Sequence, residues 1–427
     1  MVTIEPLDPV TTDETVTRRA RLSGTTGAET VSIEIPAAIA GDVEDHAHLV
    51  GLGIWPAILA RTDLHVDAPI DAAHLGAVER LLHIYRSWMP ALPLPRVTVA
   101  SEGVRPPGRP GAGTAAYFSR GVDSMYEAAL DTRARPPLTH LVFLDGIEPR
   151  HSPATAAGEI EQAQAAADLL GLPLEVVRTD AHALTGHAQD WSDVHGCVLA
   201  ALATSLGGDV GRVVIPSTDS YATLVPYGSH PLLDPLLSTP SLTVLHGDLG
   251  AGRAAKVAAI AAQRPDLLPF LKVCYEEDRV DNCGVCGKCI ITMAALQAVD
   301  ALDAATGFPN AIPMDELRAM RPAPLQSRQH WIDVVRLLDQ TGRAPETRDA
   351  ILHALRRAAR PDAKRWRRIV REKRAGIRPS LHPSWKDPSR GIDWTHHTET
   401  VRVMDEGWSE RLGHPLPEPP EGLRPPS

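Results

Sequence analysis

Aromatic residues, long apolar runs and an apolar leader are scarce or missing in this sequence. Aromatic residues make up only 4% of the 427 residues, although 43% are hydrophobic. No apolar run approaches the roughly 20 residues that a membrane-spanning helix needs, and residues 1–14 are acidic and lack the apolar segment of a secretion signal. We therefore expect a cytoplasmic chain without a membrane partner. The length predicts two or three domains.

Cysteine is also scarce, and its distribution excludes a disulfide framework. Four of the five cysteines lie within residues 274–289, and the fifth is Cys197. Clustered cysteines at short spacings are typical of metal binding in a reducing compartment. Cys197 stands alone in a largely apolar helical stretch. It is therefore interpreted as a buried structural residue or, alternatively, as a sulfur carrier.

Negative charge dominates the chain as a whole. The formal net charge is −10, which excludes a general attraction to nucleic acid. One stretch has the opposite sign, because eleven Lys or Arg residues and only two acidic residues lie between Arg356 and Arg378. This asymmetry predicts either a site for an anionic partner or a solvated helix.

Changes in composition divide the chain into five regions. The first contains both alternating and helical apolar patterns, as an α+β unit does. A stretch rich in Pro and Gly follows, and we interpret it as a linker. The later part of the chain is helical and basic, and its end is dominated by proline. The predicted regions are an N-terminal α+β domain at 1–105, a linker at 106–113, an α/β domain at 114–300, a helical basic extension at 301–412 and a disordered tail at 413–427.

Short apolar runs alternate with helical segments from residue 114 onward. Runs of this length without polar alternation fit strands that are buried on both faces of a parallel sheet. The helical segment after the second run ends at Gly171, with Pro173 beyond it, which is a typical helix stop. The alternation predicts an α/β fold with a doubly wound parallel sheet. The runs are 115–118, 141–144, 174–177, 213–215 and 243–245.

The first of these runs leads into a turn that is rich in serine. Residues 119–124 read Ser-Arg-Gly-Val-Asp-Ser and lead into a predicted helix over 122–130. A strand, loop and helix in this order point backbone N–H groups and the positive end of the helix at an anion. Gly121 permits close approach of the backbone, and Ser119 and Ser124 add hydroxyl donors. The alternative is that the turn only caps the helix.

This hexapeptide resembles the Ser-Gly-Gly-x-Asp-Ser signature of the PP-loop ATP pyrophosphatases, enzymes that adenylate a substrate and release pyrophosphate. The resemblance implies ATP and Mg²⁺ as cofactors, with Asp123 and Ser124 in catalysis. Arg120 stands where the family usually has glycine, so its side chain either obstructs the approach to pyrophosphate or adds a cation to it. The nucleotide-binding residues that the resemblance implies are Ser119, Arg120, Gly121, Val122, Asp123, Ser124 and, after the next strand, Asp145.

Two later loops match the family in the same order. Residues 145–148, Asp-Gly-Ile-Glu, resemble the substrate-facing loop after the second strand, which implies that Glu148 contacts the substrate. Residues 214–221 resemble the loop after the fourth strand, which lines the acceptor pocket of the family. The resemblance therefore implies that Ser217 and Asp219 contact the acceptor.

A third segment resembles a basic region near the phosphates. It consists of His-Gly-Asp at 246–248 together with Arg253 and Lys256. The resemblance implies that the two cations are catalytic and neutralise the leaving pyrophosphate. The alternative is that both are ordinary surface residues of a helix.

The cysteine cluster is the most specific pattern in the chain. Four thiolates at these spacings suit a closed tetrahedral zinc site, in which no position stays open for water, so the site is structural. An iron–sulfur cluster is the alternative, because thiolates bind it as well. Gly284 and Gly287 let the backbone fold tightly, and Lys288 offsets the anionic charge. The ligands are Cys274, Cys283, Cys286 and Cys289.

The cysteine motif, followed by a helix, resembles that of 7-cyano-7-deazaguanine synthase (QueC) and its relatives. Two motifs thus indicate one branch of the PP-loop superfamily, over residues 114–300. The resemblance implies an AMP-forming ligase that adenylates the carboxylate or amide of a deazapurine-like small molecule. QueC-like proteins also occur in bacterial anti-phage operons, so a partner protein is a second kind of acceptor. We expect a homodimer or a subunit of a complex.

Two other functions are compatible with the same residues. An RNA sulfur-transfer enzyme would use the same adenylation, and the basic stretch between Arg356 and Arg378 favours it. A degenerate nucleotide-binding scaffold is the third hypothesis, and Arg120 is its main support. The retention of Ser119, Gly121 and Asp123 favours an enzyme instead.

Overall fold

A ten-stranded sheet runs through the computed structural model of the chain. The strand order is β10-β9-β6-β7-β8-β3-β2-β1-β4-β5. Neighbouring strands are parallel except in the pairs β1–β2, β2–β3 and β3–β8. The structure describes residues 1–24, 29–88, 93–103, 110–130, 135–147, 152–185, 191–275, 278–322 and 326–359.

The N-terminal half of the sheet is covered by helices on one face. Alternate residues of β2 are buried and exposed, as in a strand with one solvent-facing side. Asp71 caps the start of α2, because its Oδ1 accepts hydrogen bonds from the N–H groups of Ala73 at 2.8 Å and His74 at 3.3 Å. The elements of this half are β1 (Val2–Thr11), β2 (Thr15–Ser23), β3 (Glu29–Pro36), α1 (Ala47–Leu59), β4 (Leu64–Asp71), α2 (Ala72–Trp88) and β5 (Val97–Gly103).

The C-terminal half is the predicted α/β unit. All five apolar runs form strands, and these are parallel to one another. The predicted helix stop is also present, because Gly171 ends α4 in the left-handed conformation at φ 69°. The elements are β6 (Gly113–Tyr117), α3 (Val122–Ala129), β7 (His140–Asp145), α4 (Pro153–Leu170), β8 (Leu174–Thr179), α5 (Trp191–Thr204), β9 (Val210–Ile215), β10 (Thr243–His246) and α6 (Arg253–Gln263).

The strand order reverses between β6 and β9 in this half. From β6 the chain proceeds outward through β7 and β8 on one side, and then through β9 and β10 on the other. Open α/β sheets bind their ligands at the carboxyl ends of the strands, at this kind of switch point. The loops that follow β6 and β9 are 118–121 and the long segment 216–242. They are therefore the natural place for a site.

The two halves share one sheet through the pair β3–β8. Ile33 pairs with Thr179 and Glu34 with Arg178. Asp180 strengthens this junction, because its Oδ1 accepts a hydrogen bond from the N–H of Ser32 at 2.7 Å. The sheet is therefore continuous across the expected linker, of which residues 104–109 lie outside the described part. The domain boundaries stay a prediction.

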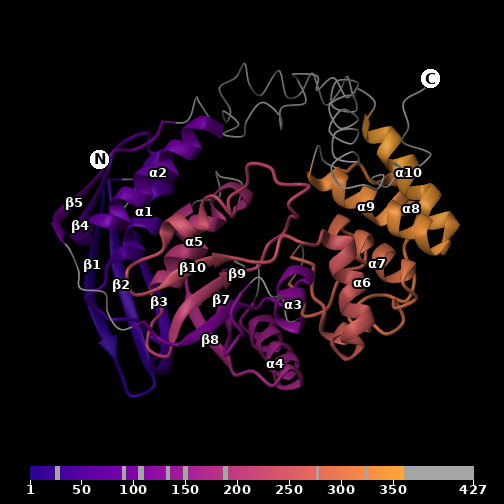
Figure 1. The fold of residues 1–427 in the computed structure, drawn as a ribbon, viewed down its shortest axis with the longest axis horizontal. Coiled ribbons are helices and arrows are strands. Elements are labelled where there is room, and N and C mark those ends of the chain that lie inside the picture. The colour runs from indigo at the N-terminus through magenta and orange to yellow at the C-terminus, as the bar shows by residue number, and fades with distance from the viewer. Residues whose placement is uncertain are drawn as a thin grey trace, which may run out of the picture.

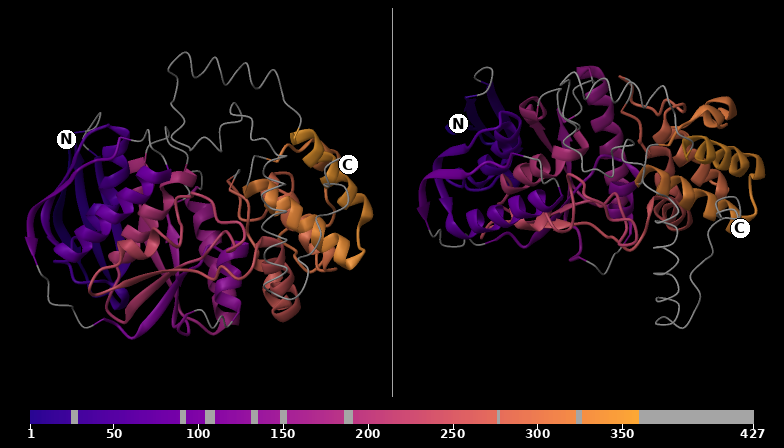
Figure 2. Two further views of the ribbon diagram at one scale, coloured as in Figure 1. Left: turned by 45° about the horizontal axis from the view of Figure 1, so that its top comes forward. Right: turned by 90° about the horizontal axis from the view of Figure 1, so that it is seen from above.

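Two hydrophobic cores lie on opposite faces of the sheet. One contains α1, α2 and α5 and extends across both halves. The other lies against the C-terminal half and contains α3, α4, α6 and the helices that follow. Successive residues of one strand point to different cores, because Tyr117 joins the first and Ala116 and Phe118 join the second. Figures 1 and 2 show the N-terminal half at one end of the molecule and the C-terminal helices at the other.

The later helices form a module beside α6. They are α7 (Gly287–Ala298), α8 (Met314–Ala319), α9 (Gln326–Thr341) and α10 (Pro345–Ala359), and shorter 3-10 helices are η1 (Ala37–Ile39), η2 (Ala181–Thr185), η3 (Asp234–Leu237) and η4 (Pro265–Phe270). The predicted basic stretch is described only as far as residue 359, and the predicted tail lies outside the described residues. Within the described ranges, no helix has the length and apolar content that crossing a bilayer requires.

Candidate functional site

The serine-rich loop after β6 folds tightly around its own hydroxyl groups. The Oγ of Ser124 accepts a hydrogen bond from the N–H of Ser119 at 3.2 Å and donates one to the carbonyl of Gly121 at 3.2 Å. Gly121 is the N-cap residue of α3, and no side chain caps this helix. Ser119 is exposed, whereas Val122 and Ser124 are buried. The first turn of α3 therefore presents N–H groups beside an open serine, as an anion site requires.

Arg120, which departs from the family pattern, points away from this loop. It adopts the left-handed conformation at φ 60°, which glycine adopts more easily. Its side chain is only 3% exposed and forms an ion pair with Glu159 of α4. Its Nη1 also donates to the carbonyl of Phe270 at 3.3 Å. The arginine therefore neither fills the space in front of the loop nor offers it a cation.

Asp123 in the first turn of α3 is held by two cations from α6. Arg253 donates to its Oδ2 at 2.8 Å, and the Nζ of Lys256 lies 3.4 Å from its Oδ1. Burial by itself would raise the pKa of Asp123, but the charges of Arg253 and Lys256 outweigh it and lower the pKa from its usual value. Lys256 is 1% exposed, so the reading of these two cations as plain surface residues is wrong.

The loop after β9 meets this cluster through Lys256. The Nζ of Lys256 donates to the carbonyl of Ser217. Ser217 is 1% exposed, and its hydroxyl donates to the carbonyl of Asp219 at 2.7 Å. The Ser217 hydroxyl therefore stabilises its own turn. Further along, Tyr221 is 75% exposed, and its N–H donates to the carbonyl of Leu249 at 2.9 Å, which joins the loops after β9 and β10.

Two further site residues, Asp145 and Glu148, are predicted after the second strand. Asp145 ends β7, one strand away from β6 at the same edge of the sheet. Its Oδ2 lies 3.5 Å from the Nε of Arg178, so the structure pairs it with β8 and not with Asp123. Glu148 lies outside the described residues.

Glu127 is a residue of this site that the sequence did not indicate. It lies on α3, is 1% exposed, and its Oε2 accepts a hydrogen bond from the N–H of Asp248 at 2.9 Å. Asp248 in turn accepts a hydrogen bond from the hydroxyl of Tyr126 at 3.3 Å. Helix α3 is thus tied to the loop after β10. No motif signals this role, because a glutamate on a helix is ordinarily exposed.

His330 is a second such residue, and it comes from α9. Its Nε2 lies 3.6 Å from Oδ1 of Asp219, and it lowers the pKa of Asp123 against the effect of burial, though less than Arg253 and Lys256 do. The sequence pattern assigns α9 only an amphipathic role. A histidine that reaches a site from a distant helix leaves no local signal.

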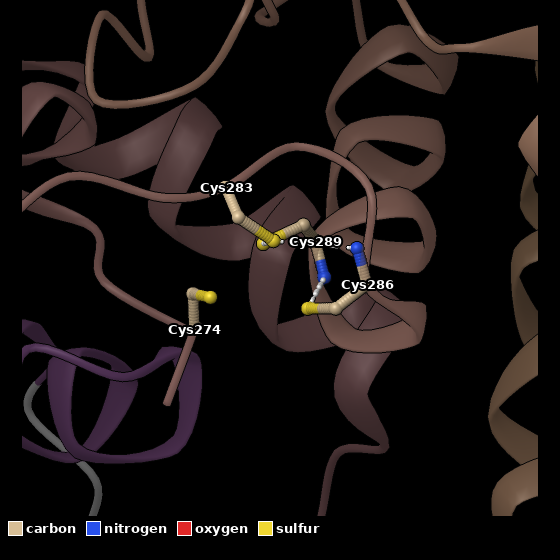
Figure 3. Close-up of side chains that lie close together, drawn as sticks. All are labelled: Cys274, Cys283, Cys286 and Cys289. Atoms are coloured by element: carbon tan, nitrogen blue, oxygen red, sulfur yellow. Dashed lines mark hydrogen bonds between the residues drawn. The ribbon is translucent and has the colours of Figure 1, made fainter. Parts of the chain in front are cut away.

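The four clustered cysteines converge as predicted (Figure 3). Their sulfur atoms all lie within 4.8 Å of one another, and those of Cys283 and Cys289 are 3.7 Å apart. A tetrahedral zinc ion with bonds of about 2.3 Å places its sulfur ligands about 3.8 Å apart. The four residues could therefore bind a metal ion such as zinc, and their donors are all sulfur, which suits zinc well. The group consists of Cys274, Cys283, Cys286 and Cys289.

The backbone around the cysteines prepares them for a metal. Cys286 is the N-cap residue of α7 and accepts a hydrogen bond from the N–H of Cys289 at 3.5 Å. Hydrogen bonds from Cys289 lower the pKa of Cys286 to about 5 against the effect of burial, so this ligand is already a thiolate at neutral pH. Gly284 is required, because its φ is 74° and a Cβ there would lie 2.4 Å from Cγ of Pro309. Gly287 has free space around it, so the expectation of a steric role there is wrong.

Asn282 joins the two arms of the cysteine cluster. Its Oδ1 accepts hydrogen bonds from the N–H groups of Val273 at 2.8 Å and Cys274 at 3.3 Å. Its Nδ2 donates to the carbonyls of Leu271 at 2.8 Å and Gly307 at 3.0 Å. The side chain is buried with all these bonds made, so it fixes Cys274 relative to the turn that carries the other three ligands.

The segment that carries Cys274 also supports the serine-rich loop. The N–H of Lys272 donates to the carbonyl of Arg120 at 3.0 Å. The Nζ of Lys272 lies 3.4 Å from Oε1 of Glu159, which also pairs with Arg120. The metal centre and the loop at 119–124 are therefore neighbours that share one hydrogen-bonded segment.

Cys197 is buried and plays no part in either centre. It is 1% exposed, and its sulfur lies 3.2 Å from the hydroxyl of Tyr85. Burial raises the pKa of Cys197 to about 12, so it is a thiol at neutral pH. This agrees with the expectation of a structural cysteine and removes the free sulfur carrier that sulfur transfer needs.

The described residues thus form a serine-rich loop with an Asp–Arg–Lys cluster and, next to it, four cysteines that could bind a metal ion. A polyanion in front of α3 would meet helix N–H groups, the buried Lys256 and the partly exposed Arg253. No protein-family model, no curated protein and no solved structure matches this chain.

Proposed function

We propose that the chain is an AMP-forming ligase of the PP-loop ATP pyrophosphatase type. The observation that carries the proposal is the convergence of Arg253 and Lys256 on Asp123 at the open first turn of α3. This convergence lies at the switch point of a parallel sheet, where nucleotide-binding folds place their ligand. The hexapeptide at 119–124 supplies the resemblance, and the geometry supplies positive charge where a pyrophosphate would need it.

In the proposed reaction, an oxygen of the acceptor carboxylate or amide attacks the α-phosphorus of ATP. The bond from that phosphorus to the bridging oxygen breaks, and pyrophosphate leaves with the electron pair. Backbone N–H groups of the loop, Arg253 and Lys256 stabilise the charge that develops on it. An amine or ammonia then displaces AMP from the adenylated acceptor. Asp123 is the carboxylate that would hold Mg²⁺, which neutralises phosphate charge when it is bound.

The cysteine centre supports the 7-cyano-7-deazaguanine synthase-like branch of this family. Its all-sulfur donor set leaves no ligand position for water, so we assign it the role of holding Leu271 and Lys272 against the loop. The acceptor that we propose is a deazapurine-like carboxylate or amide, either free or destined for a partner protein. A homodimer or a larger complex would provide the place for such a partner.

One observation counts against each of the two alternatives. Sulfur transfer needs a reactive cysteine, and Cys197 is buried with a pKa of about 12. The scaffold hypothesis relied on Arg120 blocking the loop, and its side chain pairs with Glu159 on the far side. The basic stretch that favoured RNA is described only up to residue 359, where Arg357 donates to the carbonyl of Arg318 at 2.8 Å.

The test is to incubate the full chain with ATP, Mg²⁺ and a panel of deazapurine carboxylates and amides, and to measure AMP and pyrophosphate. We expect both products in equal amounts with the right acceptor, and a fall of about 100-fold or more in kcat for Asp123→Ala. Asp13→Ala is the matched control, because Asp13 is exposed in the N-terminal half. Release of ADP and phosphate, or no AMP with any acceptor, would contradict the proposal.

A further inference from the structure

Helix α9 belongs to the C-terminal extension, yet it lies against the start of α6. A Cβ on Gly252, the N-cap residue of α6, would lie 3.3 Å from Oδ2 of Asp333 on α9. Gln329 of the same helix donates to Oδ1 of Asp333 at 2.9 Å, which holds this carboxylate on the face toward α6. Figure 1 shows α9 beside α6 and α7, at the end of the molecule away from the N-terminal half. His330 lies one helical turn before Asp333 on α9, and the contact between α9 and α6 places it at the candidate site.

His330 lies beside Asp219, one of the two carboxylates of the site. Its Nε2 lies 3.6 Å from Oδ1 of Asp219 in the loop after β9, and its charge acts on Asp123 at the start of α3. The side chain is 13% exposed. Together with Arg253 and Lys256 of α6, it is one of three basic side chains that lower the pKa of Asp123 in the first turn of α3. Three basic groups around one accessible helix N-terminus suit a ligand that carries several negative charges.

The ring nitrogen that faces Asp219 makes no hydrogen bond. A separation of 3.6 Å is too long for one, and Nε2 of His330 is a buried atom without a hydrogen-bond partner among the described residues. Buried polar atoms are ordinarily bonded, so an exception calls for an explanation. Hydrogen bonds of catalytic sites are often long before the substrate is bound and shorten in the complex. A ligand at the α3 terminus would draw the imidazole into such bonds.

We propose that His330 binds the phosphate end of the nucleotide, so that the C-terminal extension completes the site that the loop at 119–124 begins. This inference rests on the proposed function, because it takes the polyphosphate of ATP as the ligand. The imidazole brings to the site a further ring nitrogen, beside Asp219, that can donate a hydrogen bond to a phosphate oxygen. The extension is then a part of the nucleotide site rather than a separate appendage.

The experiment is a calorimetric titration of the full chain with pyrophosphate alone, with ATP and with AMP, in the presence of Mg²⁺. For His330→Ala we expect pyrophosphate and ATP to bind about 10-fold more weakly or worse, because a hydrogen bond to a charged group is lost. AMP binding is expected to stay unchanged. His330→Gln keeps a side-chain donor and should recover part of the affinity. His353→Ala is the matched control, since His353 is exposed on the next helix.

The outcomes separate the inference from the function it rests on. Wild-type affinity for pyrophosphate in the His330→Ala variant would overturn the role of His330 and leave the ligase proposal intact. Equal weakening of AMP and pyrophosphate would also overturn it, because it would show a structural effect of the substitution. A wild-type chain that binds neither ATP nor pyrophosphate would overturn the proposed function and this inference together.

Discussion

The two halves belong to one sheet but differ in their relation to solvent. In the N-terminal half, strands such as β2 alternate between buried and exposed residues, and one face stays uncovered. In the C-terminal half, β6 is buried along its whole length, because helices cover both faces. In a sheet that helices cover on both faces, polar side chains lie at the ends of the strands. This is where Asp123, Lys256 and Asp219 gather.

The comparison also shows where each half places its buried charges. Arg18 in the N-terminal half donates to backbone carbonyls of Gly41 at 2.9 Å and Asp42 at 2.7 Å, which holds the approach to α1. In the C-terminal half, buried Arg120 and Lys272 share Glu159, and Arg253 and Lys256 share Asp123. The first arrangement secures a loop, whereas the second positions a loop and a helix end for a ligand.

The largest expected effect is that loss of the metal destabilises the C-terminal half and leaves the N-terminal half folded. Cys283→Ser should remove the bound metal and destabilise the C-terminal half by more than about 4 kcal/mol, because a closed metal site contributes directly to folding. Metal analysis and hydrogen exchange would measure this. Amides of α7 to α9 should lose protection, while those of β1 to β4 keep it.

Cys197→Ser provides the control for that experiment, since Cys197 lies outside the cluster. It should keep one zinc ion per chain. Iron with acid-labile sulfide in place of zinc would favour the cluster alternative. Equal loss of protection in both halves would show that the sheet unfolds as one unit, and it would remove the contrast drawn above.

The second effect concerns the arginine that replaces glycine in the loop. Arg120→Ala should cost about 3–5 kcal/mol, because it leaves Glu159 buried with Lys272 alone. Arg120→Gly should be less harmful by about 1 kcal/mol, because glycine adopts the φ of 60° without strain. Urea unfolding of both variants measures the difference. An alanine variant as stable as wild type would show that the ion pair with Glu159 contributes nothing.

The third effect is a loss of stability in acid that centres on the loop between β9 and β10. Burial, with a further contribution from His246, lowers the pKa of His230 to about 4. The unfolded chain therefore binds a proton at this residue below about pH 6.5, whereas the folded chain does so only near pH 4. Stability should fall by about 1–2 kcal/mol as the pH drops through this window, because solvent screens part of the effect.

His230→Asn should reduce that fall, and it keeps an acceptor for the N–H of Leu232, which bonds to Nδ1 of His230 at 3.1 Å. His83→Asn on the exposed face of α2 is the control. Unfolding free energies measured between pH 7 and pH 4.5 give the comparison. Identical pH profiles for wild type and His230→Asn would refute the assignment and leave His48 and His74 of the N-terminal half, whose pKa values burial also lowers, as candidate acid-sensitive groups.

The smallest expected effect comes from relief of backbone strain at a residue whose charge is not buried. Arg61 follows α1 in the N-terminal half, has φ 54°, and is exposed. Arg61→Gly should stabilise the chain by about 0.5 kcal/mol, since relief of strain exceeds the entropy that glycine adds to the unfolded state. Thermal unfolding of Arg61→Gly and Arg120→Gly measures the contrast. An Arg→Gly substitution should stabilise the chain at residue 61 and destabilise it at residue 120. Stability changes of the same sign in both variants would show that the effect of the substitution does not depend on which half contains it.

The C-terminal half was predictable because its strands are uniform apolar runs. Residues 115–118 and 141–144 carry that pattern, and the Ser-Arg-Gly-Val-Asp-Ser turn marks the helix start. Strand β2 was not predicted, because Arg18, Arg19 and Arg21 interrupt its apolar residues and only pairing with β1 and β3 makes it a strand. The joining of both halves depends on the β3–β8 pair, which links residues that are far apart in the sequence and carry no local signal.

Some residues of the site could likewise be predicted from the sequence, and others could not. The four cysteines were predictable because ligand spacing is local, and Arg253 and Lys256 because they follow a recognisable segment. Asn282, Glu127 and His330 act through contacts with distant segments, which a single sequence does not display. The orientation of Arg120 also needed the structure, because its partner Glu159 lies on another helix.

The hydrogen bonds of the serine-rich loop have a consequence for the order of events during synthesis. Arg120 donates to the carbonyl of Phe270, 150 residues further along the chain, and its own carbonyl accepts from Lys272. On the ribosome, strands β1 to β4 emerge early and can pair among themselves, since N-terminal regions fold first. The loop at 119–124 has to wait for residues 270–289 to emerge and for the cysteines to capture their metal. If the cysteines bind a metal as proposed, a cell short of that metal would make a chain whose first half is folded and whose loop at 119–124 is unfinished.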